Sequence, residues 1–402
     1  MSQIPIMFLS DGVDQSSGLA RVTRDLCTML VSNPKFRVAS LGYHGCGTIR
    51  LPWAMYAMAN NEFGELSLPY AWQDFSRGEP GIILTIWDIS RLLWLSRPEY
   101  LQDEDLKQRI IALRRTAKVW GYFPVDSTGP GDRLTTMARE TLLGLDRILV
   151  TSPWAEGVMR RTLGDQACAQ RGLTWLPHSI NDQVFNEEHA VADVMLSTDY
   201  PPVATIGIVA TNQIRKDWGL VAETCAILKQ RIPNACFWWH VDVDVRHWSI
   251  PALLEDFGLQ NITEVTHAPI EDKELAARYR RCDVTLHPGS EGFGYTIWES
   301  LACGIPVIHG DYASGASLMH TCDLSQYLVK PAAWRYETEF NCVRPVFNPM
   351  DWAEKVMTVL KMDNSGKILA ASDNPGLTGK VEHLAVKNLY YPWKRWFEDG
   401  IR

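Results

Sequence analysis

Short apolar segments alternate with a longer segment of helical periodicity along the first part of the chain. Residues 20–31 place apolar side chains at the spacing of an amphipathic helix. Strands that alternate with helices predict a mostly parallel sheet covered on both faces. Residues 42–80 are rich in Trp, Tyr, Asn and Pro and predict irregular structure. The expected strands are residues 4–9, 36–41, 82–87, 119–123 and 148–150.

A second series of the same kind begins after residue 202. A chain of 402 residues exceeds the size at which a single hydrophobic core normally stops growing. We therefore predict an α/β protein with two Rossmann-like domains, residues 1–185 and 203–380. Residues 186–202 are polar and acidic, end in Pro-Pro and predict a linker. The amphipathic, aromatic segment 381–402 predicts a C-terminal helix. The expected strands of the second series are residues 203–209, 235–243, 262–266, 284–287 and 306–308.

Composition indicates a soluble globular protein, with 46% hydrophobic and 21% charged residues. No apolar run approaches the roughly 18 residues that a membrane-spanning helix needs. The first ten residues lack the basic region of a signal peptide. The nine cysteines are scattered and form no C-x-x-C pair. These features predict a cytoplasmic protein with free thiols.

Charge is unevenly distributed along the chain. Residues 1–180 carry 19 Lys and Arg, of which 16 are Arg, against 18 Asp and Glu, a balance of +1, so the remaining −9 belongs to the second half. Guanidinium groups bind phosphate in a bidentate fork. The arginine bias is therefore compatible with phosphate or nucleic-acid contacts, although arginine is also a common surface residue.

The most informative passage is residues 290–299, SEGFGYTIWE, in which Glu291 and Glu299 lie eight residues apart. We expect a strand end, a glycine turn and a helix start. Gly292 and Gly294 let the backbone approach a ligand, and the free N–H groups of a first helical turn suit phosphate. Carboxylates beside that pole accept hydrogen bonds from sugar hydroxyls. The alternative is a capping box from Thr296 to Glu299 that serves only its own helix.

This passage and the turn CGIP that follows it resemble the E-x7-E signature of retaining glycosyltransferases of the family 4 type. The resemblance implies the GT-B architecture, with a cleft between two Rossmann-like domains and a C-terminal helix that crosses back to the first domain. It also implies that Glu291 contacts the transferred sugar and that Glu299 contacts the nucleotide ribose. The implied donor-binding loop comprises Glu291, Gly292, Phe293, Gly294, Tyr295, Thr296 and Glu299.

Arg215 and Lys216 follow the first strand of the second domain and are expected at a helix start. Two adjacent cations there suit a diphosphate leaving group. They resemble the family's Arg and Lys that hold the donor diphosphate, although the family often has the arginine several residues earlier, which makes Lys216 the firmer assignment. The alternative is a solvated basic helix start.

In the first domain, Gly18 ends a polar strand-to-helix loop that faces the donor phosphates in the resembling family. Arg21 and Arg24 lie one turn apart just behind it, within reach of an anionic group. An ordinary strand-to-helix loop is the alternative for all of these residues except Gly18. Asp126 follows a buried strand where family members commonly have a histidine, so it is a candidate for binding a sugar hydroxyl or for acting as a general base. Trp87 and Asp88 are candidates for acceptor contacts, with a helix N-cap as the alternative for either aspartate.

Two further patterns bear on organisation and metals. Residues 176–185 resemble the family's hinge element between domains, which supports the domain boundary more than a catalytic role for His178. Asp242 and Asp244 form an Asp-x-Asp, which binds metal in glycosyltransferases of another fold. Their alternation with valine has the period of a strand end, so we expect no metal. Trp53 and Trp72 join Trp87 as candidates for stacking on an acceptor.

Together these features predict a metal-independent glycosyltransferase with a UDP- or GDP-sugar as donor and no other cofactor. The expected catalytic residues are Glu291, Asp126, Arg215 and Lys216. A saccharide or glycolipid is the default acceptor. Residues 9–24 are similar to bacteriophage-encoded members, some of which glycosylate hydroxymethylcytosine in DNA, so DNA modification in a host cytoplasm is an alternative. A non-catalytic nucleotide-sugar-binding protein is the third possibility.

Overall fold

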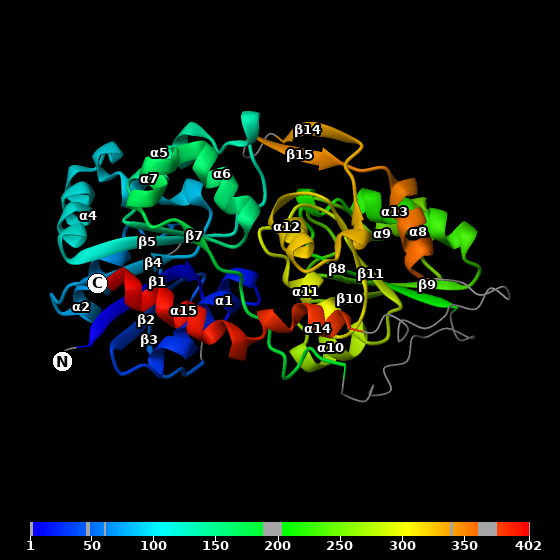
Figure 1. Cartoon of the computed structure of the whole chain (residues 1–402), viewed down its shortest axis with the longest axis horizontal. Coiled ribbons are helices and arrows are strands. Elements are labelled where there is room, and N and C mark those ends of the chain that lie inside the picture. The colour runs from blue at the N-terminus through cyan, green and yellow to red at the C-terminus, as the bar shows by residue number, and fades with distance from the viewer. Residues whose placement is uncertain are drawn as a thin grey trace. The chain divides into compact units, whose positions relative to one another are not determined.

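The computed structural model describes residues 3–45, 49–59, 62–187, 203–337, 341–360 and 376–401. The chain divides into two compact units, one of residues 1–179 with 390–402 and one of residues 180–389 (Figure 1). Each unit has a parallel sheet connected through helices, so the predicted pair of Rossmann-like domains is confirmed. Most of the predicted linker, residues 188–202, lies outside the described residues.

The first unit is built on a seven-stranded parallel sheet with the order β3-β2-β1-β4-β5-β6-β7. All five predicted strands are present. The strands are β1 (Ile4–Asp11), β2 (Phe36–Tyr43), β3 (Ala54–Ala57), β4 (Gly81–Thr85), β5 (Ala117–Phe123), β6 (Arg147–Val150) and β7 (Thr174–Trp175). The connecting helices are α1 (Gly18–Val31), α2 (Leu68–Ser76), α3 (Leu93–Ser96), α4 (Glu104–Thr116), α5 (Thr136–Leu143), α6 (Pro153–Leu163) and α7 (Asp165–Gln170), with 3-10 turns η1 (Ile89–Leu92), η2 (Pro98–Tyr100) and η3 (Pro130–Asp132).

The prediction of irregular structure over residues 42–80 is wrong in part. β3 adds a parallel edge strand beside β2, and α2 packs on the core. The helix buries Leu68, Ala71, Trp72 and Phe75, a spacing of three to four residues that the surrounding Pro and Tyr residues obscure in the sequence. Trp72 therefore belongs to the core, where its Nε1 donates to Thr116 Oγ1 at 3.0 Å.

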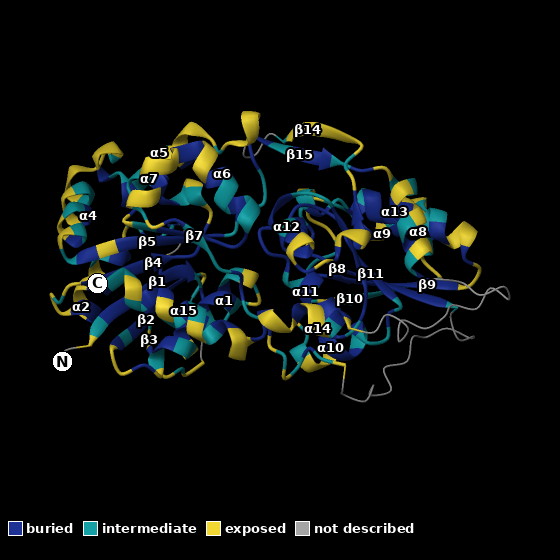
Figure 2. Cartoon of the chain, viewed as in Figure 1, coloured by how far each residue is buried: buried dark blue, intermediate teal, exposed yellow. Residues whose placement is uncertain are grey.

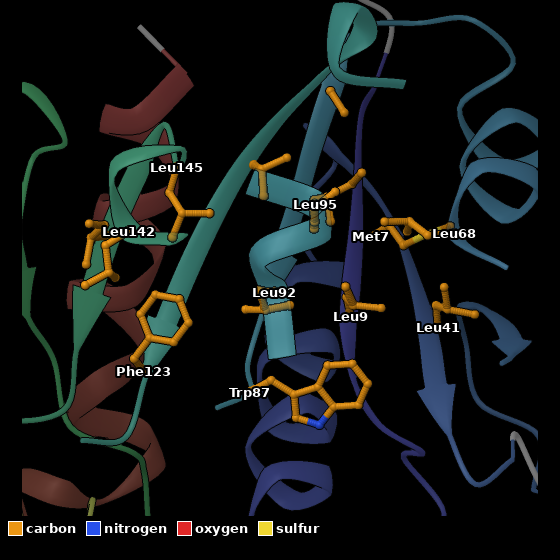
Figure 3. Packing of buried hydrophobic residues seen from close by; sticks show 14 of the residues in the cluster. Met7, Leu9, Leu41, Leu68, Trp87, Leu92, Leu95, Phe123, Leu142 and Leu145 are labelled. Carbon is orange, nitrogen blue, oxygen red and sulfur yellow. The ribbon is translucent and has the colours of Figure 1, made fainter. Parts of the chain in front are cut away.

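Trp87 is also a core residue, which corrects its assignment as an acceptor contact. The side chain is 0% exposed and lies among Leu9 and Leu92 (Figure 3). Its Nε1 donates to Asp11 Oδ1 at 3.2 Å, so the polar edge of the indole is satisfied inside the unit. Trp53 is likewise buried and donates to Ser40 Oγ. None of these three indoles presents a face for stacking.

The C-terminal helix α15 (Val386–Ile401) begins in the second unit and ends in the first. Its aromatic face packs on the sheet of the first unit. Phe397 lies 6.4 Å from Phe8 and 6.0 Å from Trp120, measured between ring centroids, and Trp396 meets Trp120 edge to face. The amphipathic pattern that predicted this helix is thus explained by a specific set of buried rings.

The second unit is built on a six-stranded parallel sheet with the order β10-β9-β8-β11-β12-β13 and carries a separate antiparallel hairpin, β14-β15. Its strands are β8 (Ala204–Val209), β9 (Ala235–Val241), β10 (Thr263–His267), β11 (Val284–His287), β12 (Val307–Gly310), β13 (Leu328–Val329), β14 (Ala333–Glu337) and β15 (Cys342–Val346). Its helices are α8 (Trp218–Arg231), α9 (Ile250–Asp256), α10 (Asp272–Tyr279), α11 (Tyr295–Ala302), α12 (Ala313–Thr321), α13 (Pro349–Leu360) and α14 (Leu377–Val381), with 3-10 turns η4 (Ile214–Lys216), η5 (Ser325–Tyr327) and η7 (Glu382–Leu384).

Burial follows this architecture. The central strands of both sheets are buried, whereas exposed residues gather on helices and connecting segments (Figure 2). The cysteines of the described residues are free and buried. In the same part of the chain, no helix is long and apolar enough to cross a membrane.

Replacing Phe397 with Ala should lower the unfolding free energy of the first unit by about 3–5 kcal/mol, because the change leaves a cavity among Phe8, Phe36 and Trp120. Hydrogen exchange of the β1 and β5 amides under native conditions measures this loss. Tyr391→Ala is the control, since Tyr391 on the same helix is 72% exposed and should change exchange by less than about 0.5 kcal/mol. Equal effects of the two variants would contradict this packing.

Stability should fall as pH is lowered from 7 to 5. Burial lowers the pKa of His178 from 6.5 to about 3, and it lowers the pKa of His240 and of His309 to about 4. The folded chain keeps these rings neutral while the unfolded chain protonates them below 6.5, so each should remove roughly 2 kcal/mol of stability at pH 5.

Urea unfolding at pH 7, 6 and 5 measures how steeply the unfolding free energy changes with pH. His178→Gln should flatten this slope by up to about 1.4 kcal/mol per pH unit, whereas His247→Gln, at an exposed position, should leave it unchanged. A slope that His178→Gln does not alter would show that His178 is protonated in the folded protein at pH 5.

Candidate active site

The predicted site residues of the second unit meet at the carboxyl ends of its strands. β8, β11 and β12 are neighbours in the sheet, and in a parallel sheet the segments that follow them emerge at one edge. The segment after β8 carries Arg215 and Lys216, which we call the cationic pair. The segment after β11 carries Glu291, and α12 starts after β12.

The carboxylate of Glu291 is bound through one oxygen. Arg215 Nη1 donates to Glu291 Oε1 at 3.0 Å, Lys216 Nζ donates to the same oxygen, and His287 Nε2 lies 3.1 Å from it. Among the described residues no donor contacts Oε2. Glu291 therefore has one oxygen held by protein and a second oxygen available to a ligand.

Lys216 is a buried cation whose position is determined by this contact. The residue is only 6% exposed, and the side chain of Arg215 is 26% exposed. Removing one partner of a buried ion pair leaves an uncompensated charge, which usually costs about 3–5 kcal/mol. With Glu291 ionised, the side chains of Arg215, Lys216 and Glu291 together carry a net charge of +1, which favours an anionic ligand.

Close approach of the two loops depends on a glycine that the sequence pattern did not single out. Gly289 has a φ of +90°, and a Cβ there would lie 2.1 Å from the carbonyl oxygen of Arg215. Arg215 Nη1 also donates to the carbonyl of Ser290 at 2.7 Å. Only glycine at 289 allows the segment after β8 to pack this tightly against the segment after β11.

Two helix N-termini begin beside Glu291. Gly294, in the left-handed region with φ +79°, is the N-cap of α11. The N–H of Gly315, in the first turn of α12, donates to the carbonyl of Glu291 at 3.1 Å, and Glu291 forms a β-bridge with Ala313. The positive ends of two helices thus lie next to the cationic pair, an arrangement suited to phosphate.

The capping-box alternative for Thr296 and Glu299 does not describe this helix. Because Gly294 is the N-cap, Thr296 is the second helical residue, and its hydroxyl contacts His287 Nδ1 at 2.8 Å. Glu299 is 2% exposed and accepts a hydrogen bond from Tyr279 OH at 3.2 Å. The two glutamates of the signature therefore lie in different surroundings, one among cations and one beside a phenol.

Two buried histidines lie behind Glu291, and sequence analysis missed both. Thr296 and Glu291 contact opposite nitrogens of the His287 ring, and the Nδ1 of His309 donates to the carbonyl of His287 at 2.8 Å. Burial, then the charges of the cationic pair and of His309, lowers the pKa of His287 well below 6.5. Both rings are neutral at neutral pH, and their polar function was hidden because they occupy apolar strands.

A buried asparagine holds the loop that carries the cationic pair. The side chain of Asn212 donates to the carbonyls of Val243 and Trp248 and accepts from the N–H of Trp248, while its own N–H donates to Asp242 Oδ1 at 2.6 Å. Asp242 also binds Arg246, and Asp244 contacts His267. These contacts account for both aspartates of the Asp-x-Asp, and the described residues contain no cluster suited to a metal ion.

In the first unit, Gly18 begins α1 as predicted. Ser17 is the N-cap: its hydroxyl accepts from the N–H of Ala20 at 3.1 Å and donates to Asp11 Oδ2 at 2.5 Å. Arg24 Nη1 donates to the carbonyl of Val13, so this arginine stabilises the loop. Arg21 is half-buried on the same helix.

Asp88 and Asp126 lie just beyond the ends of β4 and β5, which are neighbouring strands. Asp88 is the N-cap residue of η1, makes no side-chain cap bond and forms an ion pair with Arg91 at 3.5 Å. Asp126 is half-buried, and Ser127 Oγ donates to it at 3.1 Å. His178 is buried against Tyr122, with 2.6 Å between Tyr122 OH and Nδ1.

Gly289→Ala should displace the cationic pair, because the added Cβ meets the Arg215 backbone. Gly78→Ala is the matched control: it has a similar positive φ of +81°, yet its Cβ would meet nothing within 4 Å. We expect backbone strain to cost each variant about 1 kcal/mol of stability, and the clash with Arg215 to cost Gly289→Ala more. Only Gly289→Ala should weaken UDP binding, by roughly tenfold or more in titration calorimetry. Similar UDP affinities in the two variants would contradict this role for Gly289.

Comparisons with known proteins agree with this geometry. Residues 250–336, which include Glu291 and the start of α12, match the family model described as glycosyl transferases group 1. Among curated proteins, no sequence matches the chain.

Solved structures are similar over the whole chain. Sucrose-phosphate synthase from Thermosynechococcus elongatus has a TM-score of 0.69 and 16% identity over 99% of each chain. Anabaena HepE in complex with UDP and glucose has a TM-score of 0.65 and 12% identity, covering 99% of this chain and 100% of that one. The catalytic domain of starch synthase IV from Arabidopsis thaliana, bound to ADP and acarbose, has a TM-score of 0.64 and 10% identity, covering 100% and 99%. The full-length likeness shows the GT-B architecture, and residues 250–336 are similar to a segment of group 1 glycosyl transferases.

Proposed function

We propose that this protein transfers a sugar from a nucleotide-diphospho-sugar to an acceptor hydroxyl, with retention of anomeric configuration. The observation that carries the proposal is the cluster of Arg215, Lys216 and Glu291 at two helix N-termini. Glu291 lies within the segment that matches the glycosyltransferase model. The similar Anabaena structure is a complex with UDP and glucose, which supports a UDP-sugar as donor. A GDP-sugar is the other donor to test.

In the proposed reaction, the cationic pair and the two helix N-termini stabilise the negative charge that develops on the leaving diphosphate. These groups are fixed before the ligand arrives, because Glu291 and the loop contacts of Asn212 already orient them. The same cations perform the charge neutralisation that a divalent metal provides in other sugar transferases, so we propose a metal-independent reaction.

Glu291 acts on the sugar and not on the diphosphate. Its Oε1 is occupied by Arg215 and Lys216, whereas Oε2 is available to accept a hydrogen bond from a sugar hydroxyl. Glu299 is proposed to contact the ribose from α11. Retention is proposed to use the leaving diphosphate to deprotonate the acceptor, with Asp126 binding a hydroxyl. An inverting reaction with Asp126 as general base is the alternative mechanism.

A neutral saccharide or glycolipid is the proposed acceptor. Asp88 and Asp126 follow the neighbouring strands β4 and β5, and carboxylates there suit hydroxyl groups and repel a polyanion. Many arginines of the first unit make contacts within it, which weakens the support that the arginine bias lent to a DNA acceptor. These contacts involve Arg24, Arg37, Arg97, Arg114, Arg160, Arg161 and Arg171.

Turnover of a panel of UDP- and GDP-sugars, read as released nucleoside diphosphate, tests the proposal. Lys216→Ala should lower turnover by roughly 10²–10³-fold, because it removes a preorganised charge at the leaving group. Lys229→Ala is the control, since Lys229 is exposed on α8 and its Nζ donates to the carbonyl of Gly258, away from Glu291. Glu291→Gln should also reduce turnover strongly while UDP still binds.

A second set of assays measures the same turnover after addition of an acceptor: oligosaccharides, glycolipids or hydroxymethylcytosine-containing DNA. We expect stimulation by a neutral saccharide or glycolipid and little dependence on salt. Stimulation by DNA that falls steeply with salt would instead identify a DNA-modifying enzyme. Nucleotide-sugar binding without turnover of any donor would identify a binding protein and contradict the proposed transfer.

A further inference from the structure

Thr296, His287 and Glu291 form a continuous row of contacts that ends at Glu291 Oε1, the oxygen that the cationic pair also binds. Thr296 Oγ1 lies 2.8 Å from His287 Nδ1, and His287 Nε2 lies 3.1 Å from Glu291 Oε1. Thr296 belongs to α11 and His287 is the last residue of β11, so the row joins the helix, the strand and the intervening loop. His287 is the middle member of the row and touches both others.

The surroundings of His287 determine which nitrogen carries its proton. The residue is 2% exposed and lies near Lys216, Arg215 and His309, all of which oppose a positive charge on the ring. A neutral ring has one N–H. The arrangement that satisfies both contacts has the Thr296 hydroxyl donating to Nδ1 and the N–H on Nε2, facing Glu291. The Nε2 contact is short but not aligned with the N–H bond, as is common before a ligand binds.

His309 fixes the strand end that carries His287. Its Nδ1 must hold the proton, because only an N–H can donate to the His287 carbonyl. The His309 ring is fully buried and packs against Gly315, where a Cβ would lie 2.9 Å from Nε2. A side chain at 315 would displace this ring. The ends of β11 and β12 and the start of α12 are therefore packed closely together around His287.

We propose that His287 is a positioning residue for Glu291. It directs Oε1 toward the cationic pair and so leaves Oε2 facing the hydroxyls of the transferred sugar. The inference rests on the proposed function for its substrate, and it adds the group that sets the orientation of the sugar-binding carboxylate. Loss of this orientation should affect sugar binding and turnover and leave binding of the free nucleotide intact, because the carbonyl of Ser290 also holds Arg215 in place.

Two conservative variants separate the contacts of His287. The amide nitrogen of Gln is four bonds from Cα, as is Nε2 of His, so His287→Gln keeps a donor for Glu291. The side-chain amide of Asn reaches only as far as Nδ1, so His287→Asn keeps the Thr296 contact and loses the Glu291 contact. Both variants lose the ring, and a purely structural role for His287 predicts similar effects of the two.

The measurements are turnover and the affinities of UDP, UDP-glucose, GDP and GDP-mannose. His287→Asn should lower kcat by roughly 10- to 100-fold, since a misplacement of about 1 Å at a reacting centre has an effect of this size. It should also lose the preference for nucleotide sugar over free nucleotide while binding UDP or GDP as the unmodified protein does. His287→Gln should retain kcat within a few-fold.

His240→Asn is the matched control. His240 is also a buried neutral histidine and its Nδ1 lies 2.9 Å from a threonine hydroxyl, that of Thr266, on strands away from Glu291. We expect reduced stability with unchanged kcat. Crystal structures of the His287 variants provide a readout that needs no substrate: Glu291 should be displaced in His287→Asn and retained in His287→Gln.

Unchanged kcat and an unmoved Glu291 in His287→Asn would overturn the positioning role. Equal losses in the Asn and Gln variants, in proportion to their stability, would also overturn it. Failure of the unmodified protein to bind any nucleotide would instead contradict the proposed function, and the position of Glu291 in the two crystal structures would still decide the role of His287.

Discussion

The buried contact between Glu291 and the cationic pair is the interaction on which the rest of the second unit's site depends. Lys216 is almost fully buried, and an isolated ammonium group cannot remain charged there without a partner. Glu291 provides that partner through one oxygen and keeps the other for a ligand. This contact therefore does two things: it balances the charge of the buried Lys216 and it fixes the orientation of the Glu291 carboxylate.

The parallel sheet makes this contact possible, and a few small or polar residues make it tight. Strands β8, β11 and β12 bring three segments to one edge although they are far apart in sequence. Gly289 removes the side chain that would separate two of them, and Asn212 binds the backbone of the neighbouring loop. The energetic cost of ordering these loops is thus met within the folded protein, before any ligand binds.

Charged residues make different kinds of contact in the two units. In the second unit, the half-buried Arg215, the buried Lys216 and Glu291 together carry a net charge of +1 beside helix N-termini, which suits an anionic ligand. In the first unit, arginines bind backbone carbonyls and nearby carboxylates, so these contacts stabilise the unit itself. Aspartates follow two of its central strands. A site for an anionic donor and a surface for a hydroxyl-bearing acceptor are consistent with this division.

The sequence by itself determined the fold class and the positions of the chemistry-bearing loops. Buried parallel strands have nearly continuous apolar segments, and helices between them have a period near 3.6, so both are visible locally. For the same reason, the second-unit loops with Arg215, Lys216 and Glu291 could be singled out as candidates, because their residue types and spacing are local properties. The amphipathic C-terminal helix was visible in the same way.

Only the tertiary structure decided which side chains meet. Periodicity does not report long-range partners, so Trp87 appeared as an acceptor contact although Leu9 and Leu92 surround it. β3 and α2 form within residues 42–80 because the neighbouring strand and core stabilise them against weak local preferences. His287 and His309 lie in strands whose apolar character hides them. Their function follows from residues 296, 291 and 315, which the fold brings together and no local pattern records.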